Sequence, residues 1–294
     1  MERFWSILKD INELIVFKHS VFALPFIFIA MIVSSYEVNQ SAWFGFRLLV
    51  LGLLCAVSAR NFAMAFNRFA DKDIDALNPR TADRPSVDGR IGKLNMIIFI
   101  ALNAAIFIFT AWLINNTAFI VSFPMLIVLA SYSLFKRFSP FAHLVLGFSL
   151  GLAPIAGTIA VSGTTHIWSW LLCLGVLFWV AGFDLLYSLQ DIDFDKAKKL
   201  HSIPSRYGWE ATFAISAFFH LLAVVFWLLF VADAALGFVS YLAVAVSAVI
   251  LFCEHMIVRR DFKKIDRAFF TLNGYLGILF FIFVLIDIVF IIGA

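Results

Sequence analysis

The sequence predicts an all-α integral membrane protein with nine transmembrane helices. The chain is 63% hydrophobic and only 14% charged, a balance that excludes an ordinary soluble protein. Apolar stretches recur along its whole length, and most reach the roughly 17–25 residues that cross about 30 Å of hydrocarbon. We expect one transmembrane domain over residues 1–294, since these stretches leave no room for a soluble domain. The nine expected spans are 17–36, 46–70, 94–114, 116–135, 141–162, 167–190, 211–232, 235–257 and 268–293.

Basic residues predict the orientation of this bundle, because loops on the cytoplasmic side are enriched in Lys and Arg. With the N-terminus inside, all 22 Lys and Arg residues except Arg47, Arg60 and Arg68 lie on the cytoplasmic side. The net charge of +3 follows from this topology and gives no indication of nucleic-acid binding. Two long connections on that side, 72–93 and 192–210, are charged and contain Pro and Gly. We expect them to cover a shared site, since loops of this length are usually functional or disordered.

Three aspartates at alternate positions occur twice, each time at the end of an apolar stretch. The copies are Asp71, Asp73 and Asp75, and Asp191, Asp193 and Asp195, with an offset of 120 residues at every position. Such an offset fits either an old duplication or coincidence. Acidic residues at the inner ends of two spans are costly unless a cation lies between them. Carboxylate and amide oxygens without His or Cys favour a hard ion, Mg²⁺ before Zn²⁺.

Helical spacing divides the aspartates of each copy into two groups. A continuing helix would align Asn67, Asp71 and Asp75 on one face, and it would do the same for Tyr187, Asp191 and Asp195. We call these sets the first and the second acidic motif. Asp73 and Asp193 lie on other faces and are equally compatible with ordinary solvated charges. Basic residues at the same end of the bundle fit a diphosphate held between metal ions and cations. They are Arg68, Lys72, Arg80, Arg84, Lys196, Lys198 and Arg206.

These motifs, in this order and in a nine-span chain, resemble the UbiA superfamily of intramembrane prenyltransferases. The stretch from Arg80 to Pro85, Arg-Thr-x-x-Arg-Pro, also resembles the first loop of that family. The resemblance implies that two Mg²⁺ ions bind a polyprenyl diphosphate, which ionises to an allylic cation that an aromatic ring attacks. It implies that Asn67, Asp71 and Asp75 hold one ion, and that Asp191 and Asp195 hold the other. Tyr187 would line the pocket near the reacting carbon.

The resemblance also implies which residues contact the substrates. Residues 18–26, 60–68 and 182–191 resemble the bacterial quinone-pathway branch, which implies 4-hydroxybenzoate or a dihydroxynaphthoate as acceptor and a bacterial cytoplasmic membrane as location. Arg60 is a candidate for the acceptor carboxylate, although an internal pair with Asp184 explains it equally well. The expected diphosphate contacts are Arg68, Lys72, Arg80, Arg84, Lys136 and Arg137, and the expected acceptor contacts are His19, Arg60, Tyr132 and Ser133.

One departure from the family pattern concerns Arg68. Many members carry an acid at this position, so Arg68 either contacts phosphate or faces the lipid headgroups. Single histidines, including His143 and His255, lie near expected span ends, and we interpret them as interfacial.

A secondary transporter or cation channel is the main competing interpretation. Intramembrane acids and proline-kinked helices occur in such proteins, but their sites lie near the midplane of the bilayer. Here the acids lie at one face beside long connections. Other activities of the superfamily, with haem, chlorophyll or lipid acceptors, also remain open.

Overall fold

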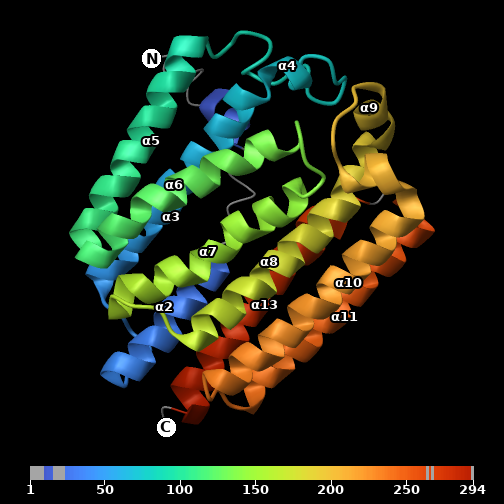
Figure 1. Cartoon of the computed structure of the whole chain (residues 1–294). Helices are drawn as coiled ribbons and strands as arrows, with labels where there is room; N and C mark the ends of the chain where they lie inside the picture. The colour runs from blue at the N-terminus through green and yellow to red at the C-terminus, as the bar shows by residue number, and fades with distance from the viewer. Residues whose placement is uncertain (1–9, 16–23, 263–264, 266–267, 293–294) are drawn as a thin grey trace. The chain divides into compact units, whose positions relative to one another are not determined.

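The computed structural model describes residues 10–15, 24–262, 265 and 268–292. All regular secondary structure among these residues is helical, and each of the nine predicted apolar stretches forms a helix over its described part (Figure 1). Eight are long and apolar enough to cross a membrane, while α2 has 16 described residues. The predicted all-α membrane fold is confirmed. The helices are α2 (Leu24–Asn39), α3 (Phe46–Ala70), α5 (Lys93–Ile114), α6 (Asn116–Phe135), α7 (Ala142–Ser162), α8 (Ile167–Ser188), α10 (Ile203–Asp233), α11 (Phe238–Arg260) and α13 (Asn273–Ile286).

The helices group into two compact units. The first contains the described residues of Met1–Ser20 and Val50–Leu134, and the second those of Val21–Leu49 and Phe135–Ala294. Each unit carries one of the two acidic motifs at the end of a membrane helix. The first motif follows α3, and the second follows α8.

In the first unit, a small apolar cluster holds the connection between α3 and α5 against the helices. Its buried members are Leu14, Ala65, Ile91 and Met96. Segment 10–15, α3, the connection and the start of α5 therefore pack together in one cluster. Tyr132 of α6 donates a hydrogen bond from its hydroxyl to the carbonyl of Ala63 in α3, at 3.4 Å. These contacts fix the C-terminal half of α3, which leads into the first acidic motif.

A network of charges ties the same connection to segment 10–15. The guanidinium of Arg90 donates to Glu13 at 2.8 and 2.9 Å, to Asp10 at 3.2 Å and to Asp88 at 2.6 Å. Hydrogen bonds from the backbone N–H and the side chain of Arg90 lower the pKa of the Asp88 carboxyl below its usual range. All of these groups lie at the surface of the unit, where ion pairs contribute little stability individually.

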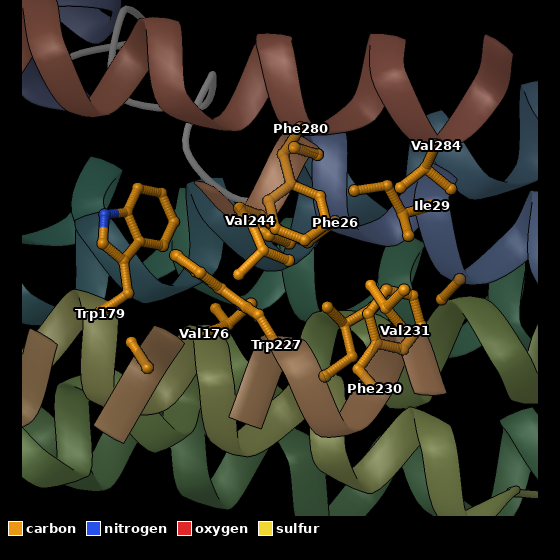
Figure 2. Close-up of a cluster of buried hydrophobic side chains, with 14 of the residues drawn as sticks. Phe26, Ile29, Val176, Trp179, Trp227, Phe230, Val231, Val244, Phe280 and Val284 are labelled. Atoms are coloured by element: carbon orange, nitrogen blue, oxygen red, sulfur yellow. The ribbon is translucent and has the colours of Figure 1, made fainter. Parts of the chain in front are cut away.

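In the second unit, the core is built from aromatic rings around α8 (Figure 2). Trp179 lies 5.1 Å from Phe26 and 6.1 Å from Trp227, measured between ring centroids. Because α8 packs against both α7 and α10, it is buried on most sides. Gly175 brings α8 close to Trp227, whose ring occupies the space that a β-carbon would fill. The C-terminal end of α8, and hence the second acidic motif, therefore stands on a tightly packed helix.

The connection expected at 192–210 is mostly helical, which corrects that part of the prediction. α9 covers Ile192–Ala197, and α10 begins at Ile203 rather than near 211. Ser202 is the reason, since its hydroxyl accepts the backbone N–H of Ser205 at 3.2 Å, as an N-cap does, and a proline follows in the first turn. Gly208, with φ of 80°, then kinks α10 close to where the apolar stretch starts.

Candidate active site

The first acidic motif lies where α3 ends and the short helix α4 (Lys72–Asp75) begins. The backbone N–H groups of Asp71 and Asp75 bond to the carbonyls four residues earlier, at 2.9 and 2.8 Å. The helical register is therefore kept, although Asp71 itself, at φ −96° and ψ 5°, has left helical geometry. The side-chain amide of Asn67 donates to an oxygen of Asp71 at 2.9 Å. The side chains of Asn67 and Asp71 are therefore in direct contact, and Asp75 follows one turn later.

Burial distinguishes the aspartates of this copy. Asp71 and Asp75 are only 2% and 5% exposed, whereas Asp73 is exposed to solvent. Arg84 reaches back from the connection and donates to Asp75 at 2.6 Å, and Thr81 donates to the carbonyl of Asp75 at 2.9 Å. A buried carboxylate needs a cationic or hydrogen-bonding partner, and Arg84 supplies one here.

Two further arginines lie beside the first motif on α3. Arg68 donates to the Asn67 oxygen at 3.3 Å and has Asp75 and Arg84 as electrostatic neighbours, so its side chain lies at the motif. Arg60 lies two turns earlier on the same helix, and Tyr132 of α6 is its electrostatic neighbour. The neighbouring Ser133 is buried. Four of the residues predicted to contact substrates therefore belong to one part of the first unit.

The second acidic motif repeats the break of the first. After α8, residues Leu189–Asp191 form a 3₁₀ turn that leads into α9. Asp191 has φ −101° and ψ 7°, close to the values of Asp71. This sparsely populated region is one in which many active-site residues are found. The expectation of an unbroken helix is wrong for both motifs, because Asp71 and Asp191 each stand at the N-cap position of a new short helix.

Asp195 organises the polar side of the second motif. Its carboxylate accepts a hydrogen bond from the hydroxyl of Ser202 at 2.7 Å, and Lys136 and His143 are electrostatic neighbours. The carbonyl of Lys136 accepts the backbone N–H of His201 at 3.0 Å, which fixes the connection after α6 beside α9. Lys136 therefore lies near the second motif.

The remaining predicted residues occupy more peripheral positions. Tyr187 is half-buried and makes an edge contact with Phe270, at 6.1 Å between ring centroids. Arg137 is exposed, as are Lys72 and Arg80 in the first unit. Asp193 is exposed as well, like Asp73, which fits the interpretation of both as solvated charges. His19 lies outside the described residues.

One pair in the second unit was missed by the sequence-based prediction. Nδ1 of His143 lies 2.7 Å from a carboxylate oxygen of Asp184, and the His143 side chain is 7% exposed. His143 is therefore not an interfacial residue, and the partner of Asp184 is His143 rather than Arg60. Asp184 precedes Tyr187 by three residues, so both lie on one side of α8, and Asp191 follows in the 3₁₀ turn after this helix. No spacing in the sequence reveals the pair, because His143 and Asp184 lie on different helices.

His255 also departs from the prediction of an interfacial position. Its ring meets that of His220 at 4.9 Å, and Nε2 lies 3.3 Å from the hydroxyl of Ser216. It therefore packs between α10 and α11.

The donor atoms of the two motifs fit Mg²⁺ rather than a closed structural metal site. Across the described part of the chain, no three His, Cys, Asp or Glu side chains gather closely enough to hold a metal ion by themselves. Each motif offers two carboxylates, and the first adds the amide of Asn67. Mg²⁺ is commonly bound by one or two carboxylates, with water and substrate phosphates as the other ligands.

Acidic motifs at the ends of two membrane helices, each with a basic residue beside it, define the class as an integral membrane protein with paired acidic motifs. Comparison with known proteins identifies the family. Residues 23–285 match the UbiA prenyltransferase family. A curated relative from Pseudomonas fluorescens (strain SBW25), named 4-hydroxybenzoate octaprenyltransferase, is 30% identical over 245 residues, or 82% of this chain and 81% of that protein.

Solved structures agree with this match. The apo structure of a UbiA homolog from Aeropyrum pernix K1 has a TM-score of 0.82 and 32% identity, covering 92% of this chain and 98% of that one. A UbiA homolog from Archaeoglobus fulgidus, bound to GPP and Mg²⁺, has the same fold, with a TM-score of 0.69, 18% identity and coverage of 95% and 99%. The chain belongs to the UbiA prenyltransferase family, and the prediction of a membrane-embedded prenyltransferase is confirmed.

Proposed function

We propose that this chain transfers a polyprenyl group from a polyprenyl diphosphate to a ring carbon of a small aromatic carboxylic acid, with Mg²⁺ as cofactor. The observation that carries the proposal is the pair of acidic motifs. The helical backbone is interrupted at Asp71 in the first and at Asp191 in the second, and a basic residue, Arg84 or Lys136, lies beside each. Curated relatives named 4-hydroxybenzoate octaprenyltransferase favour 4-hydroxybenzoate as acceptor, and a dihydroxynaphthoate is the alternative. The product would be a precursor of a membrane quinone.

Each acidic motif would hold one metal ion through its side-chain oxygens. Asn67, Asp71 and Asp75 would hold one Mg²⁺ ion, and Asp191 and Asp195 a second, with the diphosphate between them. Bound there, Mg²⁺ neutralises the diphosphate and makes it a better leaving group. This assignment requires the two units to act as one transmembrane domain, which we propose.

Basic residues would stabilise the diphosphate as it leaves. Arg68, Arg84 and Lys136 have their charged groups beside the motifs and would bind the oxygens on which negative charge develops. Arg is suited to this task because its planar fork binds phosphate with two parallel hydrogen bonds. Exposed cations would instead attract the anionic head of the donor from a distance. These are Lys72, Arg80 and Arg137.

The acceptor acid would bind beside α3 and α6. Arg60 lies two helical turns before Asn67, so its guanidinium could hold the acceptor carboxylate while the ring faces the allylic carbon. Tyr132 and Ser133 would line the same place, with Tyr187 near the reacting carbon and His19 as a further candidate contact. This arrangement predicts that an aromatic substrate without a carboxylate binds more weakly.

The isoprenoid tail would remain in contact with the membrane. Large apolar side chains are exposed along several helices, including Leu94, Ile98 and Phe109 on α5, as expected for a surface in lipid. Burial of an isoprenoid gains about 0.8 kcal/mol per CH₂ group, so a fully enclosed tail would bind almost irreversibly. We propose a cytoplasmic membrane as the location, with both motifs at the cytoplasmic side. The connection 72–93 and α9 would limit access of water to the cation.

The test is turnover by the full-length protein in lipid nanodiscs. Protein, Mg²⁺, a polyprenyl diphosphate and one aromatic acid at a time are incubated, and the prenylated acid and released diphosphate are measured. We expect Asp71→Asn and Asp191→Asn each to lower turnover by about 100-fold or more, since ligand loss removes metal-assisted departure. Asp73→Asn and Asp193→Asn are matched controls on exposed positions and should stay near the native rate. Native turnover in either ligand variant, or no product with any acid, would contradict the proposal.

A further inference from the structure

The His143–Asp184 pair is a buried ionisable group outside the two acidic motifs. His143 is in the first turn of α7, and Asp184 is in the last two turns of α8. Their side chains are 7% and 23% exposed, and the imidazole Nδ1 lies 2.7 Å from the carboxylate oxygen. Burial of such a pair inside a membrane helix bundle is costly, and intramembrane ionisable residues usually mark functional sites.

The geometry of this contact fixes which nitrogen can react. An ionised carboxylate only accepts hydrogen bonds, so Nδ1 of His143 carries the proton that it shares with Asp184. The lone pair of the neutral ring is then on Nε2. Nε2 is buried and meets no hydrogen-bond partner among the residues that the structure describes. A buried nitrogen without a partner is unfavourable by itself and is explained if a ligand supplies the partner.

The position of His143 connects it with the second acidic motif. Asp184 lies one turn before Tyr187 on α8, and Asp191 follows in the 3₁₀ turn after this helix. His143 is an electrostatic neighbour of Asp195, so the imidazole lies close to the acidic site. The other helix packed on α7 is α2, whose ionisable side chains, Tyr36 and Glu37, lie at its far C-terminal end. Among the described residues, Asp184 contacts His143 directly and Asp195 interacts with it electrostatically.

We propose that His143 is the general base that removes the proton from the acceptor ring, and that Asp184 positions it; this inference rests on the proposed function. When the C–O bond of the donor breaks, diphosphate leaves and the allylic carbon forms a C–C bond to the ring carbon beside the hydroxyl. That ring carbon then holds both the prenyl group and its hydrogen. Nε2 takes the hydrogen as a proton, and the C–H electron pair returns to the ring and restores aromaticity.

Asp184 has a separate task in this step. Its negative charge stabilises the imidazolium that forms and holds the ring with Nε2 directed at the substrate, as a carboxylate does for other catalytic histidines. The proton on the imidazolium then passes to water when product leaves. General bases typically contribute about 100- to 10,000-fold to a rate, so losing this one should be easily measured.

The experiment compares His143→Gln and Asp184→Asn with the native full-length protein in nanodiscs. The acceptor is 4-hydroxybenzoate, either unlabelled or deuterated at the positions beside the hydroxyl. The histidine control is His255→Gln, a half-buried position between α10 and α11 that has no place in the proposed site. Binding of the donor is followed separately, as the thermal shift produced by Mg²⁺ with an unreactive prenyl diphosphate analogue.

We expect His143→Gln to lower turnover by about 100-fold or more while the thermal shift stays native. A deuterium isotope effect should appear in this variant, because ring deprotonation becomes the slow step, whereas the native enzyme should show almost none. Asp184→Asn should show the same pattern with a smaller loss. Native turnover in His143→Gln, or a loss without an isotope effect, would overturn the role of His143. If the native protein prenylates no acid, the proposed function itself fails.

Discussion

The ion pair between Arg84 and Asp75 allows a quantitative test of how the first acidic motif is stabilised before metal binds. The side chains are 24% and 7% exposed, and their closest atoms are 2.6 Å apart. At an effective dielectric constant of about 20, this separation gives a gross attraction of about 6 kcal/mol. Desolvation of both groups offsets most of that attraction, so the pair adds little compared with two apolar side chains.

Removing only Arg84 should nevertheless be destabilising. Loss of one partner of a fully buried pair costs about 3–5 kcal/mol, because the other charge stays buried without compensation. Arg84 is a quarter exposed, so we expect about 2–3 kcal/mol for Arg84→Ala in a metal-free buffer. Asp75→Asn should cost less, about 1–2 kcal/mol, since Arg84 can still turn toward water. The double variant buries neither charge, which predicts a coupling energy of about 1–2 kcal/mol.

The assay is a double-mutant cycle measured by reversible unfolding in mixed micelles containing EDTA. The cycle uses the native protein, Arg84→Ala, Asp75→Asn and the double variant. Addition of Mg²⁺ with an unreactive donor analogue should stabilise Arg84→Ala at least as much as the native protein, because in the proposed assignment the metal would neutralise Asp75. A coupling energy below about 0.3 kcal/mol would refute the reasoning, since it would mean that the two charges do not stabilise each other.

Three further predictions concern the scaffold. Ser202→Ala removes the cap of α10 and a hydrogen bond to the second motif, so it should lower stability by about 1 kcal/mol in the same unfolding assay. Gly175→Leu directs a side chain into the ring of Trp227 and should fail to give folded protein by size-exclusion chromatography. The lowered pKa of Asp88 contributes stability that is present above about pH 4 and is lost as pH falls through the folded-state pKa. The backbone amides of residues 83–93 should therefore lose protection from hydrogen exchange at acid pH, after correction for intrinsic rates. In Arg90→Gln the protection of these amides should no longer depend on pH.

Much of the fold was predictable because the membrane leaves few alternatives. A helix satisfies all of its backbone groups internally, so long apolar stretches in a membrane protein fold as helices whatever their detailed sequence. The boundaries of α5, α6 and α8 were correct to within about two residues for this reason. The start of α10 was missed because it depends on the local cap at Ser202 and not on hydropathy. The cap is visible in the sequence as Ser-Ile-Pro-Ser, residues 202–205. It starts the helix at Ile203, although residues 203–210 are too polar for hydropathy to predict a membrane helix there.

Only those features of the candidate site that depend on spacing along a single helix could be predicted from the sequence. Spacing of four residues fits the observed contact between Asn67 and Asp71, and the backbone keeps its register from Asp71 to Asp75. It gave no indication that Arg84 would fold back onto the motif, since that contact depends on turns within the connection. The pairing of His143 with Asp184 was also hidden, because it depends on how α7 packs against α8. Contacts between helices follow from side-chain packing, which a single sequence does not reveal.

The position of the acids relative to their helices gives a further physical reason for a cation site. Both motifs follow the C-terminal ends of long helices, α3 and α8, where the helix dipole places partial negative charge. Both the helix dipole and burial disfavour the ionised form of a carboxylate in such a position. Basic side chains would stabilise these helix ends better. Within the described structure, Arg84 and Lys136 partly offset this field. Two separate helix ends that share this unfavourable arrangement, and the same backbone break, are best explained by a common demand for strong binding of cations. The acidic residues at these helix ends would therefore lower the stability of the fold while raising its affinity for metal ions. Asp71→Asn and Asp191→Asn should accordingly be more stable than the native protein when no metal is present.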